Sequence, residues 1–485
     1  MIEGRLKART KAETAPEVAA DNNANRELWL TVLFAALHLP LGIALKNAGM
    51  LGIVHPILVF GIGLYLAARI ESKHANVALV LAYIIGAEVL WRMAQTPIYW
   101  EFGKYASVAI IVVAMVRRSR FDVPKLPTIF FAFLIPGCLL TIVAESWASA
   151  TSILSFYMSG PLLLFFSCWF FYKTKISPAE FKQMLIAMII PLISVGFTTF
   201  FYAVSAESIT FGGESNFETS GGFGPNQVSA MLGLGVFVSF AGWSLLKNDI
   251  GFKIFFGLTG LWCAALCVLT FSRGGMYNAV AGIVALLVFG FGDVTAGLRR
   301  VGLALAALAV FVLFIFPVID DFTGGALEER FEDTGTSRRS DIALSDLYTF
   351  IEHPFLGVGV GAGAEYRKKY LGYGAASHTE FSRLISEHGF FGVGALILLA
   401  ALMVINIRRP NSRPGRAFIA GIFVWSLSFM MNTGMRLAAP AFILGLGFAA
   451  IVAVRGSLPL AARFSRRDRI LRLGGQPARI APSNS

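Results

Sequence analysis

The stretch "TFSRGGM", residues 270–276, separates two long apolar runs and sets a turn between them. One run leads in over residues 252–271, and the other leads out over residues 276–291. Between them stand two glycines and a permanent cation, Arg273. Because a run of about 20 apolar residues is long enough to cross a bilayer, this pattern predicts a membrane span, a tight turn and a second span.

The whole chain shares this character. Of its 485 residues, 56% are hydrophobic and 14% are charged, whereas a soluble domain carries about 25% charge. The composition therefore predicts an all-α polytopic membrane protein surrounded by membrane lipids. The net charge of +12 does not indicate nucleic-acid binding, because the basic residues cluster in short loops and at both ends, where orientation signals lie.

About fourteen transmembrane helices can be laid along the chain. We expect them near residues 28–46, 50–69, 75–91, 98–116, 128–144, 150–172, 183–203, 227–246, 252–271, 275–291, 299–318, 389–407, 416–432 and 437–454. Lysine and arginine gather in alternate gaps and at both ends, while the gaps 145–149 and 204–226 contain neither residue. By the positive-inside rule, both termini are expected to be cytoplasmic and the turn around Arg273 to face outward.

These spans divide the chain into five parts. We expect an N-terminal cytoplasmic tail over 1–27, spans 1–11 over 28–318, a large helical outer loop over 319–388, spans 12–14 over 389–454, and a basic cytoplasmic tail over 455–485. The outer loop lies between spans 11 and 12. Its residues 340–352 and 377–388 have apolar side chains at helical spacing, so both segments are predicted to be helices.

The second of these helices carries its own start and stop signals. Ser377, followed three residues later by Glu380, is typical of a capping box, and Gly389 is expected to end the helix. Glu380, Arg383 and Glu387 stand at spacings that favour a structural charge ladder. Between the two helices, "GVGVGAG" at 357–363 lacks the strand context of a dinucleotide site and is expected to form a close-packed turn.

Permanent cations gather on the predicted outer face. They are Arg273, Arg338, Arg339 and Arg436. Guanidinium groups bind phosphate oxygens in a bidentate way, and Gly274 and Gly275 would let an anion approach the backbone at a helix start. The alternative is that Arg273 only reaches up to lipid headgroups.

His378 is the candidate general base. It is expected in the first turn of the 377–388 helix, where the positive helix end disfavours the imidazolium ion. A neutral imidazole can accept a proton from a hydroxyl group. The alternative is a surface histidine at a helix start. Within the spans, His38 and Glu88 are ionisable groups with no partner evident in the sequence.

Three motifs together resemble the superfamily of O-antigen ligases and O-antigen polymerases. They are "TFSRGG", "SRRSD" followed by "FIEHPFLGVGVGAG", and "SHTEFSRLISEHGFFG", which together cover about residues 270–395. The superfamily has an SRG turn, an arginine before a helix that ends in HPxxGxG, and HNxxLxxxxExGxxG leading into a span. The chain departs from this pattern at Thr379, where asparagine is usual, and at Ala343, where tryptophan is common, which leaves the acceptor open.

The resemblance implies a metal-independent, inverting glycosyltransferase without a cofactor, in a bacterial inner membrane. Its donor would be a glycan on undecaprenyl diphosphate, held on the periplasmic face, and its acceptor a glycan or lipid A–core. By position, Arg273 and Arg339 would hold the diphosphate and His378 would be the base. Arg338, Arg436, Gly274, Gly275 and Glu387 would help to bind the substrates.

Three functions remain open at this stage. A polymerase of exopolysaccharide or O-antigen repeat units, with a possible chain-length regulator as partner, is favoured over a ligase of lipopolysaccharide biosynthesis. A flippase for lipid-linked glycans is the alternative from another class. Transporters place charges at the membrane midplane and show paired repeats, whereas here the charges lie at one face.

The predicted topology can be tested by labelling a single introduced cysteine. A membrane-impermeant thiol reagent should label Ser337→Cys in intact spheroplasts, because the basic gaps place the loop 319–388 outside. The parent chain, with its four native cysteines, measures the background. Labelling that appears only after lysis would reverse the whole orientation.

Overall fold

The computed structural model describes residues 25–205, 215–245, 249–290, 294–332, 339–410 and 412–451. Most of the two predicted tails and the candidate residue Arg338 lie outside this part of the chain. The regular elements of the described residues are helices, apart from one short parallel pairing of β1 (Lys175–Ile176) with β2 (Ala450–Ile451). The predicted all-α polytopic membrane class is confirmed at this level.

The helices, listed here in chain order with their bounds, range from single turns to 29 residues. The first half contains α2 (Leu41–Asn47), η1 (Gly49–Ile53), α3 (Val54–Ala68), α4 (His74–Met93), α5 (Phe102–Arg117), α6 (Lys125–Ala144), α7 (Trp147–Tyr157), α8 (Ser159–Phe171), α9 (Pro178–Ser205), η2 (Glu218–Ser220) and α10 (Pro225–Leu245). The second half contains α11 (Ile250–Leu269), α12 (Arg273–Gly290), α13 (Val294–Val310), η3 (Phe311–Ile315), α14 (Phe316–Phe322), α15 (Ala326–Glu332), α16 (Arg339–Glu352), α17 (Gly363–Leu371), α18 (Glu380–Arg408), α19 (Arg413–Thr433) and α20 (Ala438–Leu446).

Among the described residues, 11 helices are long and apolar enough to cross a membrane, or up to 12 if α7 and α8, which meet at 50°, form one bent span. The sequence predicts about fourteen. The remaining two predicted spans, 98–116 and 437–454, correspond to α5 and α20. At 1.5 Å per residue these helices are only about 24 and 13 Å long, shorter than the roughly 30 Å hydrocarbon core.

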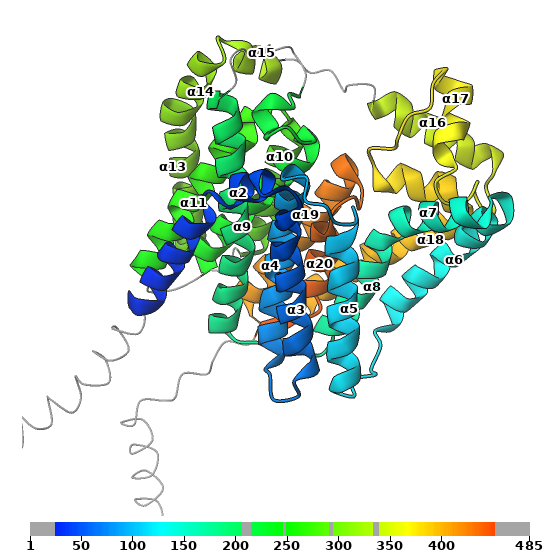
Figure 1. Cartoon of the computed structure of the whole chain (residues 1–485), viewed down its shortest axis with the longest axis horizontal. Coiled ribbons are helices and arrows are strands. Elements are labelled where there is room, and N and C mark those ends of the chain that lie inside the picture. The colour runs from blue at the N-terminus through cyan, green and yellow to red at the C-terminus, as the bar shows by residue number, and fades with distance from the viewer. Residues whose placement is uncertain are drawn as a thin grey trace, which may run out of the picture.

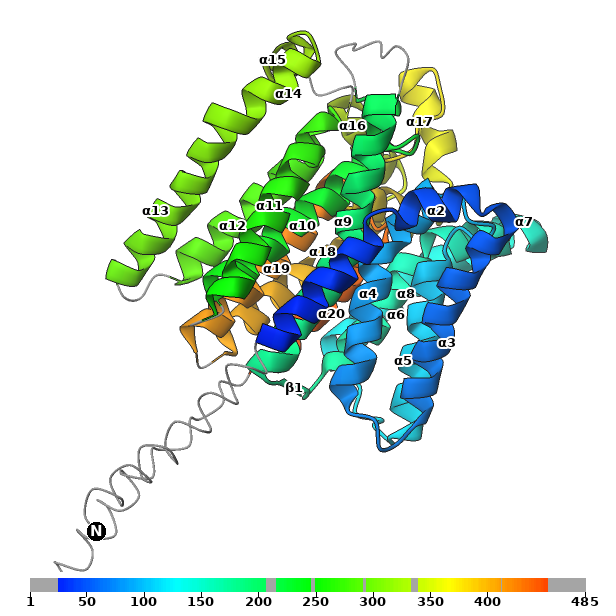
Figure 2. The same ribbon diagram turned by 60° about the vertical axis from the view of Figure 1, so that its left-hand side comes forward.

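The two ends of the helical bundle differ in what they carry. Helices α15, α16 and α17 lie at one end, whereas the turn between α3 and α4 lies at the other (Figure 1). β1 also lies at the end away from α16 and α17 (Figure 2). The basic residues Arg69 and Lys73 belong to the α3–α4 turn. This arrangement separates the predicted basic gaps from the predicted outer loop.

The helix predicted over 340–352 is present as α16, but the helix predicted over 377–388 begins later. Its N-cap is Thr379, whose side chain accepts a hydrogen bond from the backbone N–H of Phe381 at 3.2 Å. The capping box at Ser377 is therefore wrong, because Ser377 lies outside the helix and bonds elsewhere. Gly389, at φ 59° and ψ −137°, breaks α18 where the sequence predicts an end.

The turn at 270–276 is held by close helix packing. α12 begins at Arg273 and packs against α10 and α19. The backbone N–H of Gly275 donates to Ser229 Oγ at 3.2 Å, and a Cβ atom at Gly275 would overlap the carbonyl oxygen of Ser229. Packing against α10 thus accounts for Gly275. A Cβ atom at Gly274 would lie 3.6 Å from Cβ of Asn432, which is ordinary contact.

The two glycines can be separated by a matched pair of variants. Gly275→Ala should force α10 and α12 apart and cost about 1–3 kcal/mol of stability, as overpacking of a close-packed interior does. Gly274→Ala should leave folding nearly unchanged. Thermal unfolding in detergent measures both variants, and equal midpoints would contradict the packing role of Gly275.

Candidate functional site

A buried carboxylate organises the helices at the end of the bundle. Asp346 in α16 has no exposed surface. Its Oδ1 accepts hydrogen bonds from Arg367 Nε at 2.8 Å and Ser386 Oγ at 3.1 Å, and its Oδ2 accepts from Ser382 Oγ at 2.6 Å and Ser377 Oγ at 3.3 Å. One side chain thereby joins α16 and α17 to α18 and to the loop that precedes α18.

The segment "GVGVGAG" packs against the end of the helix 380–388, as the predicted close-packed turn would. The backbone N–H of Val358 donates to the carbonyl of Ser386 at 3.1 Å, and that of Gly359 donates to the carbonyl of Glu387, also at 3.1 Å. Gly357 has φ +73°, and a Cβ atom there would overlap the backbone of Glu387. The glycines thus allow one backbone to satisfy the last carbonyls of another helix turn.

The charge ladder on α18 is also present, and it is buried. Arg383 donates through Nη1 to Glu387 Oε2 at 2.7 Å and forms a second ion pair with Glu380. Glu380 in turn accepts the backbone N–H of Met435 at 3.2 Å. The carboxylate of Glu387 is therefore engaged by Arg383.

His378 lies between Ser377 and the N-cap Thr379, so it precedes the helix and does not belong to its first turn. Burial lowers the pKa of His378 most, and the charges of Arg339, Arg436 and Arg367 act in the same direction, so that together they bring it to about 4. The ring is thus neutral at neutral pH. The neutral form is favoured by burial beside arginines. The sequence predicts the same neutral ring, but for a different reason, namely the positive end of a helix.

Two of the predicted arginines, Arg339 and Arg436, converge on this loop, and a third, Arg273, is near Arg339. Arg339, at the start of α16, donates to the side-chain carbonyls of Asn432 and Asn226, each at 3.4 Å. Burial lowers the pKa of Arg339, and the charges of Arg273, Arg330 and Arg436 lower it as well. Arg436 donates through Nη2 to the carbonyl oxygen of Ser377 at 2.8 Å. The cations therefore meet beside His378.

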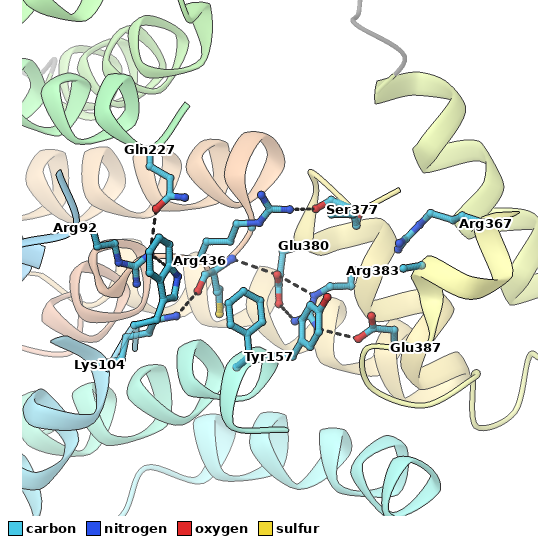
Figure 3. A pocket seen from close by; sticks show the side chains of 16 residues that line it. Arg92, Lys104, Tyr157, Gln227, Arg367, Ser377, Glu380, Arg383, Glu387 and Arg436 are labelled. Carbon is cyan, nitrogen blue, oxygen red and sulfur yellow. Dashed lines mark hydrogen bonds and ion pairs between the residues drawn. The ribbon is translucent and has the colours of Figure 1, made fainter. Parts of the chain in front are cut away.

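A cavity of about 390 Å³ opens beside the loop, next to these residues (Figure 3). Its lining joins the N-terminal half of the chain to α18 and the 434–436 segment. The side chains that line it are Arg92, Trp100, Lys104, Phe156, Tyr157, Gln227, Ala364, Arg367, Ala376, Ser377, Glu380, Arg383, Glu387, Gly434, Met435 and Arg436. His378, Arg273 and Arg339 are outside this lining, whereas Arg436 belongs both to the lining and to the convergence of arginines, so the cavity and that convergence are neighbours that share one side chain.

Sequence reasoning missed the N-terminal side of this cavity. Arg92 pairs with Glu88 at 2.7 Å and donates to the carbonyl of Arg436 at 3.2 Å. Lys104 pairs with Glu101 and donates to the carbonyl of Met435 at 3.2 Å. The spacing of Glu88 and Arg92, one helical turn, is a signal that could have revealed the partner of Glu88.

The fold and the site define a multi-pass membrane protein with a buried polar centre at one end of its helices. Residues 258–397 match the family described as O-antigen ligase. This match confirms the resemblance to the O-antigen ligase and polymerase superfamily, and it covers the arginine of the 270–276 turn, α16 and the start of α18. A comparison with curated proteins found no match.

Asp346 offers a test of how the site is held. Asp346→Ala leaves the buried guanidinium of Arg367 without its carboxylate, and breaking such a pair costs about 3–5 kcal/mol. The variant should therefore unfold at a markedly lower temperature in detergent. The control is Glu352→Ala, which removes an exposed pair with Lys369 and should leave the unfolding temperature nearly unchanged, because surface ion pairs contribute little. Equal losses in both variants would contradict the organising role of Asp346.

Proposed function

We propose that the protein is a glycosyltransferase that moves a glycan from a lipid-linked diphosphate to a hydroxyl group of an acceptor. The observation that carries this proposal is the convergence of Arg339 and Arg436 on the neutral side chain of His378, with Arg273 close enough to Arg339 to lower its pKa. The match to the O-antigen ligase family supports the same general class. We place the site on the periplasmic face of a bacterial inner membrane, in agreement with the predicted topology.

The arginines suit the leaving group. When the glycosidic bond to the diphosphate breaks, its electron pair stays on the phosphate oxygen, and negative charge grows there. Fixed cations that already face this position stabilise the transition state without reorganisation. Arg339 is held by two neutral carboxamides, so its charge is available to an anion. Arg273, at the first residue of α12, adds a second cation.

His378 suits the acceptor. Its neutral ring would take the proton of the acceptor hydroxyl as the oxygen attacks the anomeric carbon from the face opposite the diphosphate. The product would have inverted configuration. A bound diphosphate also offsets the arginine charges that lower the pKa of His378, so donor binding would make the ring a stronger base.

We favour a repeat-unit polymerase for exopolysaccharide or O-antigen, with undecaprenyl diphosphate as the carrier. A ligase that transfers the glycan to lipid A–core is the second candidate, because the matching family bears the ligase description. A flippase fits less well. Arg92 is next to the last residue of α4 and Lys104 is near the first residue of α5, so these charges lie at helix ends and not at mid-span.

The decisive experiment separates donor binding from turnover. Purified protein in lipid nanodiscs is given an undecaprenyl-diphosphate glycan, and both binding and product are measured. His378→Ala should bind the donor normally yet form product about 10²–10⁴-fold more slowly, which is the usual cost of losing a general base. Arg273→Ala and Arg339→Ala should lower turnover by about 10²–10³-fold.

Two further variants sharpen the outcome. His378→Gln can form hydrogen bonds but cannot accept the proton, so it should be as inactive as His378→Ala. Arg273→Lys keeps the charge but loses the planar fork and should remain impaired. Near-normal turnover of His378→Ala would refute its role as base, and full activity of both Arg273 variants would reduce that residue to a headgroup contact.

A further inference from the structure

We propose that the cavity of about 390 Å³ is the subsite for an uncharged, hydroxyl-rich sugar of the acceptor glycan. The inference rests on the proposed transferase function and adds the substrate class and the residues that recognise it. The volume of the cavity falls within the range of roughly 300–1,000 Å³ that is usual for small-molecule pockets. Its lining combines aromatic faces with fixed polar groups, as a pyranose ring, with apolar C–H faces and a polar edge, requires.

Four of the five cations that line the cavity stand in ion pairs, and the fifth, Arg436, donates to the carbonyl oxygen of Ser377. Arg383 is paired with Glu380 and Glu387, while Arg367 is paired with Asp346. On the opposite wall, Arg92 pairs with Glu88 and Lys104 pairs with Glu101. The walls formed by these pairs offer a diphosphate little excess positive charge, whereas Arg436, at the boundary with Arg339, faces the convergence of arginines. A neutral ligand that forms hydrogen bonds fits this wall better than an anion does.

Aromatic side chains supply the apolar contacts. Trp100 lines the cavity with 47% of its surface exposed, and the guanidinium of Arg92 lies 4.8 Å from the centre of its ring. Phe156 and Tyr157 contribute two further rings to the lining. Arg92 also has a buried Nε–H that meets no hydrogen-bond acceptor within the described part of the chain. A sugar hydroxyl is the kind of group that would satisfy it.

Two residues that line the cavity are the direct sequence neighbours of residues at the proposed catalytic centre. Asn226 accepts a hydrogen bond from Arg339, while the next residue, Gln227, lines the cavity and accepts from Arg92 at 3.0 Å. Ser377 lines the cavity, and the next residue is His378. Figure 3 shows Arg436 between Gln227 and Ser377. Through Ser377 the cavity borders His378, and we therefore assign its sugar to the acceptor; because Gln227 and Arg436 also bring it close to Arg339, the donor glycan is the alternative that the second test decides.

The first test measures binding without turnover. The probe is the uncharged repeat-unit oligosaccharide released from the source bacterium's own polysaccharide, with inorganic pyrophosphate as the charged probe. Trp100→Ala should weaken oligosaccharide binding about tenfold, while Trp100→Phe should restore part of it. Pyrophosphate binding should be unchanged in both. Trp147→Ala, at an exposed tryptophan outside the lining, is the matched control and should change neither.

The second test asks which substrate provides the sugar. In steady-state turnover, Trp100→Ala should raise KM for the acceptor about tenfold and leave KM for the donor unchanged. A rise in donor KM instead would move the subsite to the donor glycan and overturn the proposal. Unchanged oligosaccharide affinity in Trp100→Ala would do the same and make Trp100 a membrane-interface residue. If no transfer occurs but oligosaccharide binding still depends on Trp100, the transferase function fails while the sugar subsite stands.

Discussion

A carboxylate without access to water must receive hydrogen bonds, and the burial of Asp346 imposes this condition on every element around it. Arg367 of α17, Ser382 and Ser386 of α18, and Ser377 of the connecting loop meet the requirement together. Ser377 is thus held by its side chain, and its carbonyl group receives Arg436. The position of His378 follows from these bonds, because it is the next residue.

The polar centre contains two electrostatic environments separated by only a few residues. Around the cavity, four of the five lining cations face carboxylates and form ion pairs, and the fifth, Arg436, lies at the boundary with the arginine cluster. Around Arg339, the partners are the neutral side chains of Asn226 and Asn432, and other arginines contribute their charges. Paired charges orient a neutral ligand through directed hydrogen bonds, whereas gathered charges attract an anion. The division matches the two substrates that a transferase must hold.

The sequence predicts the parts of the fold and of the site that depend on residues close together in the chain, and it does not predict those that depend on contacts between distant residues. The apolar runs, α16 and the break at Gly389 follow from local patterns, as does the ladder of Glu380, Arg383 and Glu387. The start of α18 was misplaced because Ser377 and Thr379 are both good N-caps, and a distant carboxylate, Asp346, binds the serine.

The missed half of the cavity depends on long-range packing. Lys104 and Arg92 donate to the carbonyl groups of Met435 and Arg436, more than 300 residues further along the chain. A local sequence pattern cannot predict such a contact. The pairing of Glu88 with Arg92 was readable from helical spacing alone. The role of Gly275 was not, because its neighbour Ser229 belongs to another helix.

The broken turn at Gly389 has a consequence for depth. α18 as a whole would be about 43 Å long, well beyond the thickness of a hydrocarbon layer. Beyond the break, residues 390–408 alone would extend about 28 Å, close to that thickness. The segment 380–388, with its buried ion pairs, would then lie beyond the acyl chains. The break at Gly389 would hold the loop that carries His378 at the level of the lipid headgroups, where the diphosphate end of the proposed carrier would also lie.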